Sequence, residues 1–62
     1  MTIVEFSNQI SSLRPTLRTF TRRFTNDREE SLDLVQDTLL KALLYRDKFR
    51  EDTNLKGWLF TI

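Results

Sequence analysis

The chain has 62 residues with one Gly, one Pro, no Cys and no His, and ten Lys and Arg against nine Asp and Glu give a formal charge of +1. A chain of this length forms at most one domain, and it buries only about 60% of its unfolded surface. The missing Cys and His exclude disulfides, thiolate catalysis, an imidazole general base and the usual zinc sites, and the balanced charge does not by itself indicate a nucleic-acid binder.

Residues 3–24 are predicted to form the first helix. Their apolar side chains recur at spacings of three and four, as in an amphipathic helix, at Phe6, Ile10, Leu13, Leu17, Phe20 and Phe24. Pro15 cannot donate a backbone hydrogen bond, so we expect either a kink there or a new segment with Pro15 in its first turn. Arg14, Arg18 and Arg22 form a basic stripe, which is either a solvated face or a surface that meets phosphates.

The second predicted helix runs from about residue 27 to about residue 48. Asn26 or Asp27 can cap its start, and the acids that follow suit the positive end of the helix dipole. At about 100° per residue, one arc of roughly 100° collects apolar side chains and is the expected core face. Its members are Leu32, Val35, Leu39, Ala42 and Leu43.

A second arc of this helix, centred roughly 120° from the first, mixes acids, an amide and leucines. Its members are Asp33, Gln36, Asp37, Leu40 and Leu44. Leucines gain nothing on a solvated face, and acids in a core are costly without a cation, so this mixture is typical of a surface that binds a basic protein. Alternatively, Leu40 and Leu44 pack against a neighbouring helix while the acids are solvated or pair with Arg18 or Arg22.

A polar loop precedes the third predicted helix, which begins at about residue 54 and makes only about two turns by Ile62. Thr53 or Asn54 can cap it, and apolar side chains return at positions 55, 58, 59 and 62. Because this helix stops without a capping residue or a polar tail, we interpret the chain as a fragment of a longer protein.

The loop and the start of the third helix are a candidate nucleic-acid contact. Arg50, Lys56 and Trp58 combine charge with an aromatic ring, a set suited to holding unstacked bases. The spacing of Trp58 indicates instead that its ring belongs to the core.

Composition also limits the remaining classes of function. No stretch approaches the roughly 20 apolar residues of a membrane span, and the N-terminus lacks the order of a secretory signal, so we expect a cytoplasmic protein with no membrane contact. No catalytic pocket can be argued for a carboxylate pair in so small a helical chain. We therefore expect neither an enzyme nor a cofactor or metal site.

Three segments resemble conserved region 2 of bacterial RNA polymerase sigma factors, most closely the extracytoplasmic-function (ECF) group. They are LDLVQD, TLLKALLYRDKF and NLKGWLFTI. Members of this family carry an acid, an apolar pair, Gln with an acid, a Leu-rich continuation and, after a short loop, a Leu-Lys/Arg-x-Trp-Leu segment. The resemblance covers residues 27–62 well and the first helix loosely, and it implies an all-α, three-helix fragment of the region 2 domain over residues 1–62.

The resemblance implies a transcription initiation factor that binds core RNA polymerase through the clamp helices of the β′ subunit. The expected polymerase-binding residues are Asp33, Gln36, Asp37, Leu40 and Leu44. In the intact protein, the loop before the third helix would help to melt and read the minus-ten element of promoter DNA. The candidate DNA contacts there are Arg50, Thr53, Asn54 and Lys56, and an anti-sigma factor is a further candidate partner.

Two other classes of protein stay open on the sequence. One is a stand-alone helical interaction module or transcription regulator that makes no DNA contact. The other is a small helix-turn-helix DNA binder, although the third helix presents few polar side chains to read base edges. The codons after Ile62 discriminate, because a basic, aromatic continuation favours the sigma factor and a stop codon favours the module.

Overall fold

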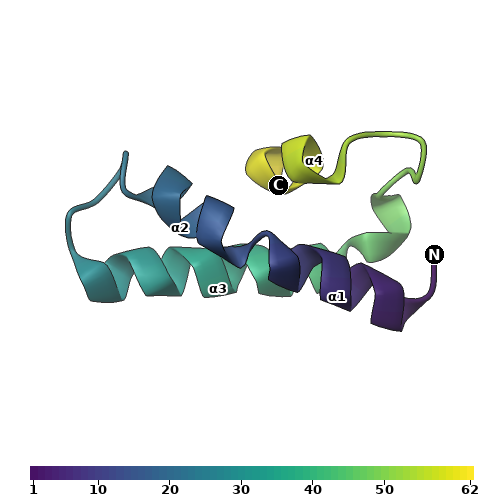
Figure 1. Ribbon diagram of the computed structural model, residues 1–62, viewed down its shortest axis with the longest axis horizontal. Coiled ribbons are helices and arrows are strands. Elements are labelled where there is room, and N and C mark those ends of the chain that lie inside the picture. Colours follow the sequence, from purple (N-terminus) through teal and green to yellow (C-terminus); the bar gives the residue numbers. More distant parts are fainter.

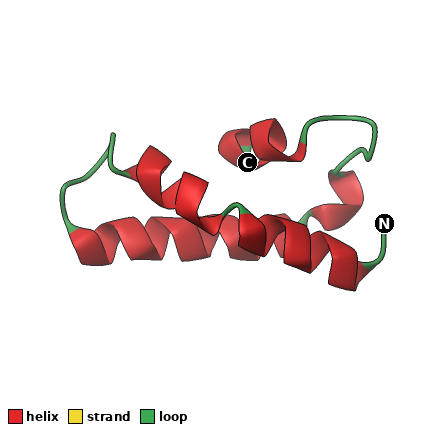
Figure 2. Cartoon of the chain, viewed as in Figure 1, coloured by secondary structure: helices red, strands yellow, loops and turns green.

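Four α-helices and one short 3-10 helix make up the computed structural model, which describes residues 1–62 and contains no strand (Figure 1, Figure 2). The helices are α1 (Ile3–Ser12), α2 (Arg14–Thr21), α3 (Arg28–Leu44) and α4 (Leu55–Thr61), and the 3-10 helix covers Arg46–Lys48. The predicted all-α class is confirmed.

The long helix α3 forms one side of the molecule, and α1 and α2 run back along it one after the other (Figure 1). The helix α4 returns over the same side and contacts both, because Trp58 meets Phe6 of α1 and Phe60 stacks on Phe20 of α2 with ring centroids 4.4 Å apart. The result is an elongated molecule of 34 × 18 × 17 Å.

The first predicted helix is divided in two at Leu13. This residue ends α1 and precedes α2, with φ −89° and ψ 0°, and Pro15 lies in the first turn of α2. An N–H group in the first turn has no acceptor within the helix, so the missing N–H of Pro15 costs no hydrogen bond there. Of the two outcomes expected for Pro15, the new segment is therefore the one observed.

Seven buried apolar side chains from α1, α2, α3 and α4 form the core. They are Phe6, Ile10, Leu17, Val35, Leu39, Ala42 and Leu59. Ala42 is fully buried, and Leu43 is half-buried against this cluster. The core thus takes side chains three and four apart on α1 and α3, as the periodicity predicted.

Three expectations about these helices were wrong. Phe24 is 68% exposed because α2 ends at Thr21, so that Phe24 lies in the turn that follows, with its ring centroid 5.3 Å from that of Phe20. Leu32 is 41% exposed, because the buried face of α3 is turned toward Ser31. The helix α3 ends at Leu44 rather than near residue 48, since the chain tightens there into the 3-10 helix.

The start of α3 depends on a single side chain. Asp27 Oδ1 accepts hydrogen bonds from the N–H groups of Glu29 at 2.9 Å and Glu30 at 3.4 Å. We expect Asp27→Ala to lower the free energy of unfolding by about 1 kcal/mol, whereas Asp27→Asn, which keeps an accepting oxygen, should lose much less. Urea denaturation followed by circular dichroism measures both, and equal losses would show that the cap is not the cause.

Candidate functional site

One face of α3 is turned away from the core along its whole length. Val35, Leu39 and Ala42 hold the helix on α1, α2 and α4, and this orientation leaves the acid- and Leu-bearing arc outside. We call this the α3 outer face, and it consists of Asp33, Gln36, Asp37, Leu40 and Leu44, all of them exposed. Leu40 is 59% exposed and Leu44 is 70% exposed, so the alternative in which both leucines pack inside the molecule is wrong.

The carboxylates of the α3 outer face are not neutralised by the arginines of α2. Asp37 lies 3.2 Å from the ammonium of Lys41, one turn along the same helix, and Asp33 makes no ion pair. An exposed pair of this kind contributes little to stability, so the acids stay available to a cation on another molecule. Lys41 was missed in the sequence, although its spacing of four from Asp37 is the signal that identifies such pairs.

An aromatic cluster anchors the loop between the 3-10 helix and α4. Phe49 and Trp58 have ring centroids 5.3 Å apart, and each of these rings lies 6.0 Å from the ring of Phe6. Tilted and edge-on pairs at these distances are favourable beyond the area that they bury. Trp58 is thus held against the core, as its spacing predicted, and the polar loop is fixed at both of its ends.

The four candidate DNA contacts come together around the start of α4, and all four are exposed. Asn54 Oδ1 caps the helix by accepting from the N–H groups of Lys56 at 3.1 Å and Gly57 at 3.4 Å. The hydroxyl of Thr53 donates to the carbonyl of Arg50 at 2.6 Å. Because Asn54 and Thr53 already bond locally, Arg50 and Lys56 are the groups with charge to offer a ligand.

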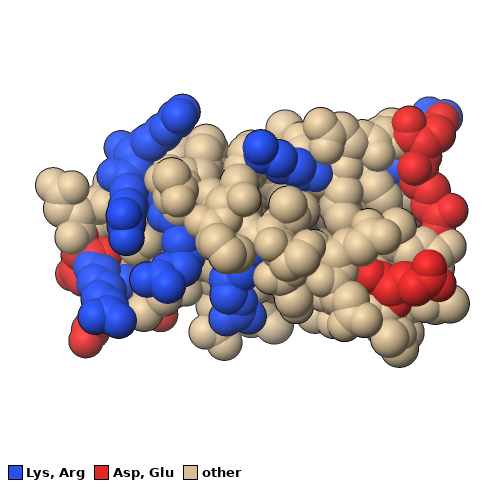
Figure 3. Space-filling model, in the orientation of Figure 1, with Lys and Arg blue, Asp and Glu red and all other residues tan.

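Acidic side chains gather at the same end of the molecule (Figure 3). Arg50 Nε lies 3.6 Å from the Asp52 carboxylate, and Glu51 forms an ion pair with the N-terminal ammonium group. The hydrogen bond and the charge of Glu51 raise the pKa of that amino group. These contacts tie the N-terminus to the loop and partly offset the positive charge that Arg50 brings to it.

These features define a small all-α domain with an outward acidic and Leu-bearing helix face and a braced polar loop leading into a further helix. Residues 9–62 match the family described as Sigma-70 region 2, and the chain belongs to this family. The resemblance seen in its LDLVQD and NLKGWLFTI segments is thereby confirmed.

The chain is also similar to a curated protein named ECF RNA polymerase sigma factor EcfG, from Rhodopseudomonas palustris (strain TIE-1). The two are 46% identical over 48 residues, which cover 77% of this chain and 26% of that protein. The chain therefore spans about a quarter of the length of this relative. The similarity itself agrees with the predicted ECF group. No solved structure matches the chain significantly. None of its helices has the length and apolar character needed to cross a membrane.

Proposed function

We propose that this chain is the part of an ECF-type sigma factor that docks on core RNA polymerase, and that it acts in transcription initiation in the cytoplasm without catalysing a reaction. Membership of the Sigma-70 region 2 family supports the class of function. The similarity to an ECF sigma factor supports the group. The polymerase supplies the chemistry of RNA synthesis, and an anti-sigma factor would compete for the same surfaces.

The docking site in this proposal is the α3 outer face, and its partner is the pair of clamp helices of the β′ subunit. The observation that carries the proposal is the exposure of Leu40 and Leu44 beside carboxylates that no arginine of the chain neutralises. A partner with leucines and basic side chains would bury the two leucines and pair with Asp33 and Asp37. Apolar burial then supplies affinity, while the charges select the partner and its orientation.

For the intact protein we propose that the loop and the first turn of α4 contact the minus-ten element. The contacts are Arg50, Thr53, Asn54 and Lys56. Moving a base out of the duplex stack costs a few kcal/mol of free energy, and stacking and hydrogen bonds in a protein pocket must offset this cost. The anchoring of the loop by Phe49 and Trp58 supports this role, because a fixed loop loses less conformational entropy when it binds.

The double variant Asp33→Arg with Gln36→Ala tests the docking face. We expect it to abolish co-purification with a β′ clamp-helix fragment while the helical circular dichroism stays unchanged, because a like charge would face the basic partner. The matched control is Asp47→Arg with Gln9→Ala, which makes the same exchanges at exposed positions outside the face. Binding retained by the first variant, or lost equally in the control, would count against the α3 outer face.

A further inference from the structure

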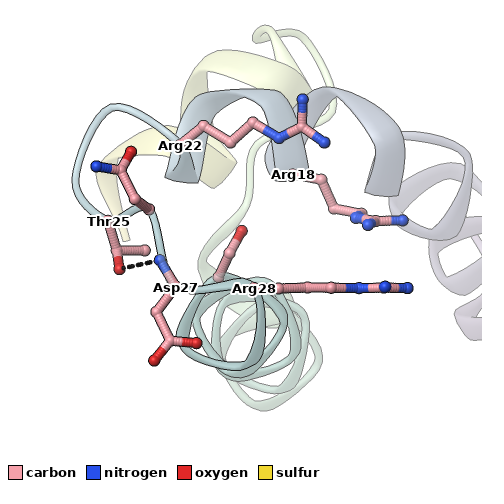
Figure 4. Close-up of a pocket in the computed structure, with 7 residues that line it drawn as sticks. Arg18, Arg22, Thr25, Asp27 and Arg28 are labelled. Carbon is pink, nitrogen blue, oxygen red and sulfur yellow. Dashed lines mark hydrogen bonds between the residues drawn. The ribbon is translucent and has the colours of Figure 1, made fainter.

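A hollow of about 370 Å³ lies between the end of α2 and the start of α3, and no apolar side chain lines it. Arg18 and Arg22 reach it from α2, and Arg28 reaches it from α3 (Figure 4). The close-up shows Arg18 and Arg28 extending in the same direction, with Arg22 above them. We call this site the arginine hollow.

The positive charge of the arginine hollow is not balanced within the chain. None of its three guanidinium groups takes part in a salt bridge. Asp27 supplies the one carboxylate of the lining, and this group turns away from the arginines and accepts the N–H groups at the start of α3 (Figure 4). Three guanidinium groups against one engaged carboxylate leave a strong local excess of donors.

A buried polar contact keeps the two walls of the hollow in register. The hydroxyl groups of Thr21 and Ser31 are hydrogen-bonded to each other between α2 and α3, and both residues are buried. Thr21 also donates to the carbonyl of Arg18 at 2.8 Å, so its single proton is used and Ser31 must donate to it. Arg18 and Arg28 are therefore carried on helices whose mutual position is fixed, which reduces the cost of ordering them on a ligand.

The chemistry of the lining favours a phosphate over a protein surface. A protein interface needs an apolar centre, and the arginine hollow has none. Planar guanidinium groups match the oxygens of a phosphate in pairs of parallel hydrogen bonds. Lys and Arg side chains also gather over α2 and the start of α3 in the space-filling view (Figure 3).

A second, separate hollow lies between α2 and the first turn of α4, beside the loop proposed to contact DNA. Arg23, in the turn after α2, and Lys56, in the first turn of α4, line it. The other lining residues are two threonines and two aromatic residues, Thr16, Thr19, Phe20 and Phe60. Arg23 and Lys56 thus place two further positive charges between α2 and α4, outside the arginine hollow.

We propose that the arginine hollow binds a backbone phosphate of the promoter DNA and thereby extends the DNA contact of α4 onto α2 and α3. This inference rests on the proposed DNA contact of the loop and adds a site that reads no bases. Phosphate contacts of this kind set the position and orientation of the duplex without carrying sequence information. They also make binding dependent on salt, because each neutralised phosphate releases counterions.

Three double variants of the chain, each removing two positive charges, test this proposal. They are Arg18→Gln with Arg28→Gln in the hollow, Arg50→Gln with Lys56→Gln at the loop, and Arg46→Gln with Lys48→Gln as the matched control. Fluorescence anisotropy with a labelled short DNA duplex gives the affinity of each between roughly 50 and 200 mM salt. We expect the hollow variant to lose about tenfold in affinity at 50 mM for each phosphate contact and to reduce the salt slope by about one per contact, with little change in the control.

The outcomes separate this inference from the proposed function. DNA binding lost in the loop variant but retained in the hollow variant would overturn the inference and leave the loop contact standing. Equal losses of DNA affinity in the hollow and control variants would show that only the net charge of the chain matters, and this result would also overturn the inference. The inference would also be overturned if the hollow variant kept its affinity for DNA and lost its affinity for the β′ clamp-helix fragment. Should the Gln variant unfold, Arg18→Lys with Arg28→Lys keeps the charge, and a loss of DNA affinity with an unchanged fold would support the guanidinium contact.

Discussion

Replacing Leu40 and Leu44 together by Ala is expected to weaken binding of the β′ clamp-helix fragment by roughly 30- to 150-fold. The two side chains are 59% and 70% exposed in the free chain, so an interface that covers them gains most of their apolar area. Truncation of a Leu in such an interface costs about 1 to 1.5 kcal/mol, and about 1.4 kcal/mol corresponds to a factor of ten in the dissociation constant. Isothermal titration calorimetry measures this loss directly.

The same double variant should leave the folded chain as stable as before. Neither leucine belongs to the core cluster, so their removal opens no cavity. A matched control is Leu32→Ala with Leu34→Ala, which shortens two leucines of α3 that are 41% and 37% exposed and lie outside the α3 outer face. Full affinity in the Leu40 and Leu44 variant, or an equal loss in the control, would remove the apolar part of the docking proposal.

Periodicity predicted the α3 outer face well because this property depends on one helix alone. Once Val35 and Leu39 turn inward, the geometry of the helix places Leu40 and Leu44 outside. The core face itself was predicted about 40° from its observed position, since Leu32 was included in it and Ser31 was not. Hydrophobicity ranks Leu32 above Ser31, but the crossing of α2 and α3 buries Ser31 as the hydrogen-bond partner of Thr21. No single-helix pattern contains that information.

The helix ends also divide into those that nearby residues in the sequence determine and those that they do not. Each cap is one of the two neighbouring candidates that the sequence offered, Asp27 rather than Asn26 and Asn54 rather than Thr53, because a capping side chain acts on N–H groups two and three residues away. The end of α3 at Leu44 was missed, since neither Gly nor Pro marks it and the following residues tighten into a 3-10 turn. The split at Leu13 was anticipated from the fixed geometry of Pro15.

The arginine hollow lies beyond what the sequence indicated. The basic stripe was recognised as Arg14, Arg18 and Arg22, and two of these line the hollow. Arg28 joins them from the next helix, and only the turn between α2 and α3 brings it beside Arg18. The spacing of residues within one helix cannot predict a site that two helices form together. The same reason explains why the aromatic bracing of the loop by Phe6 could not be predicted.

The largest effect on stability is expected for Ile10→Ala. Ile10 is 2% exposed in a core of only seven side chains, and truncation of a buried Ile costs about 2 to 5 kcal/mol. A chain of 62 residues has a total stability of roughly 3 to 9 kcal/mol, so this one change removes a large part of it. We expect the midpoint of thermal unfolding to fall by at least about 8 °C, because each kcal/mol shifts a small domain by about 4 to 8 °C.

Ile3 offers a control for Ile10 with the same side chain on the same helix. It is 53% exposed, so Ile3→Ala removes the same atoms without opening a buried cavity and should change stability by about 0.5 kcal/mol or less. Thermal unfolding followed by circular dichroism compares the two variants. Similar losses in both would mean that α1 is not held to α3 as described. Because α1 is one of the supports that turn the α3 outer face toward solvent, the Ile10 variant should also lose the β′ fragment in the temperature range where it unfolds.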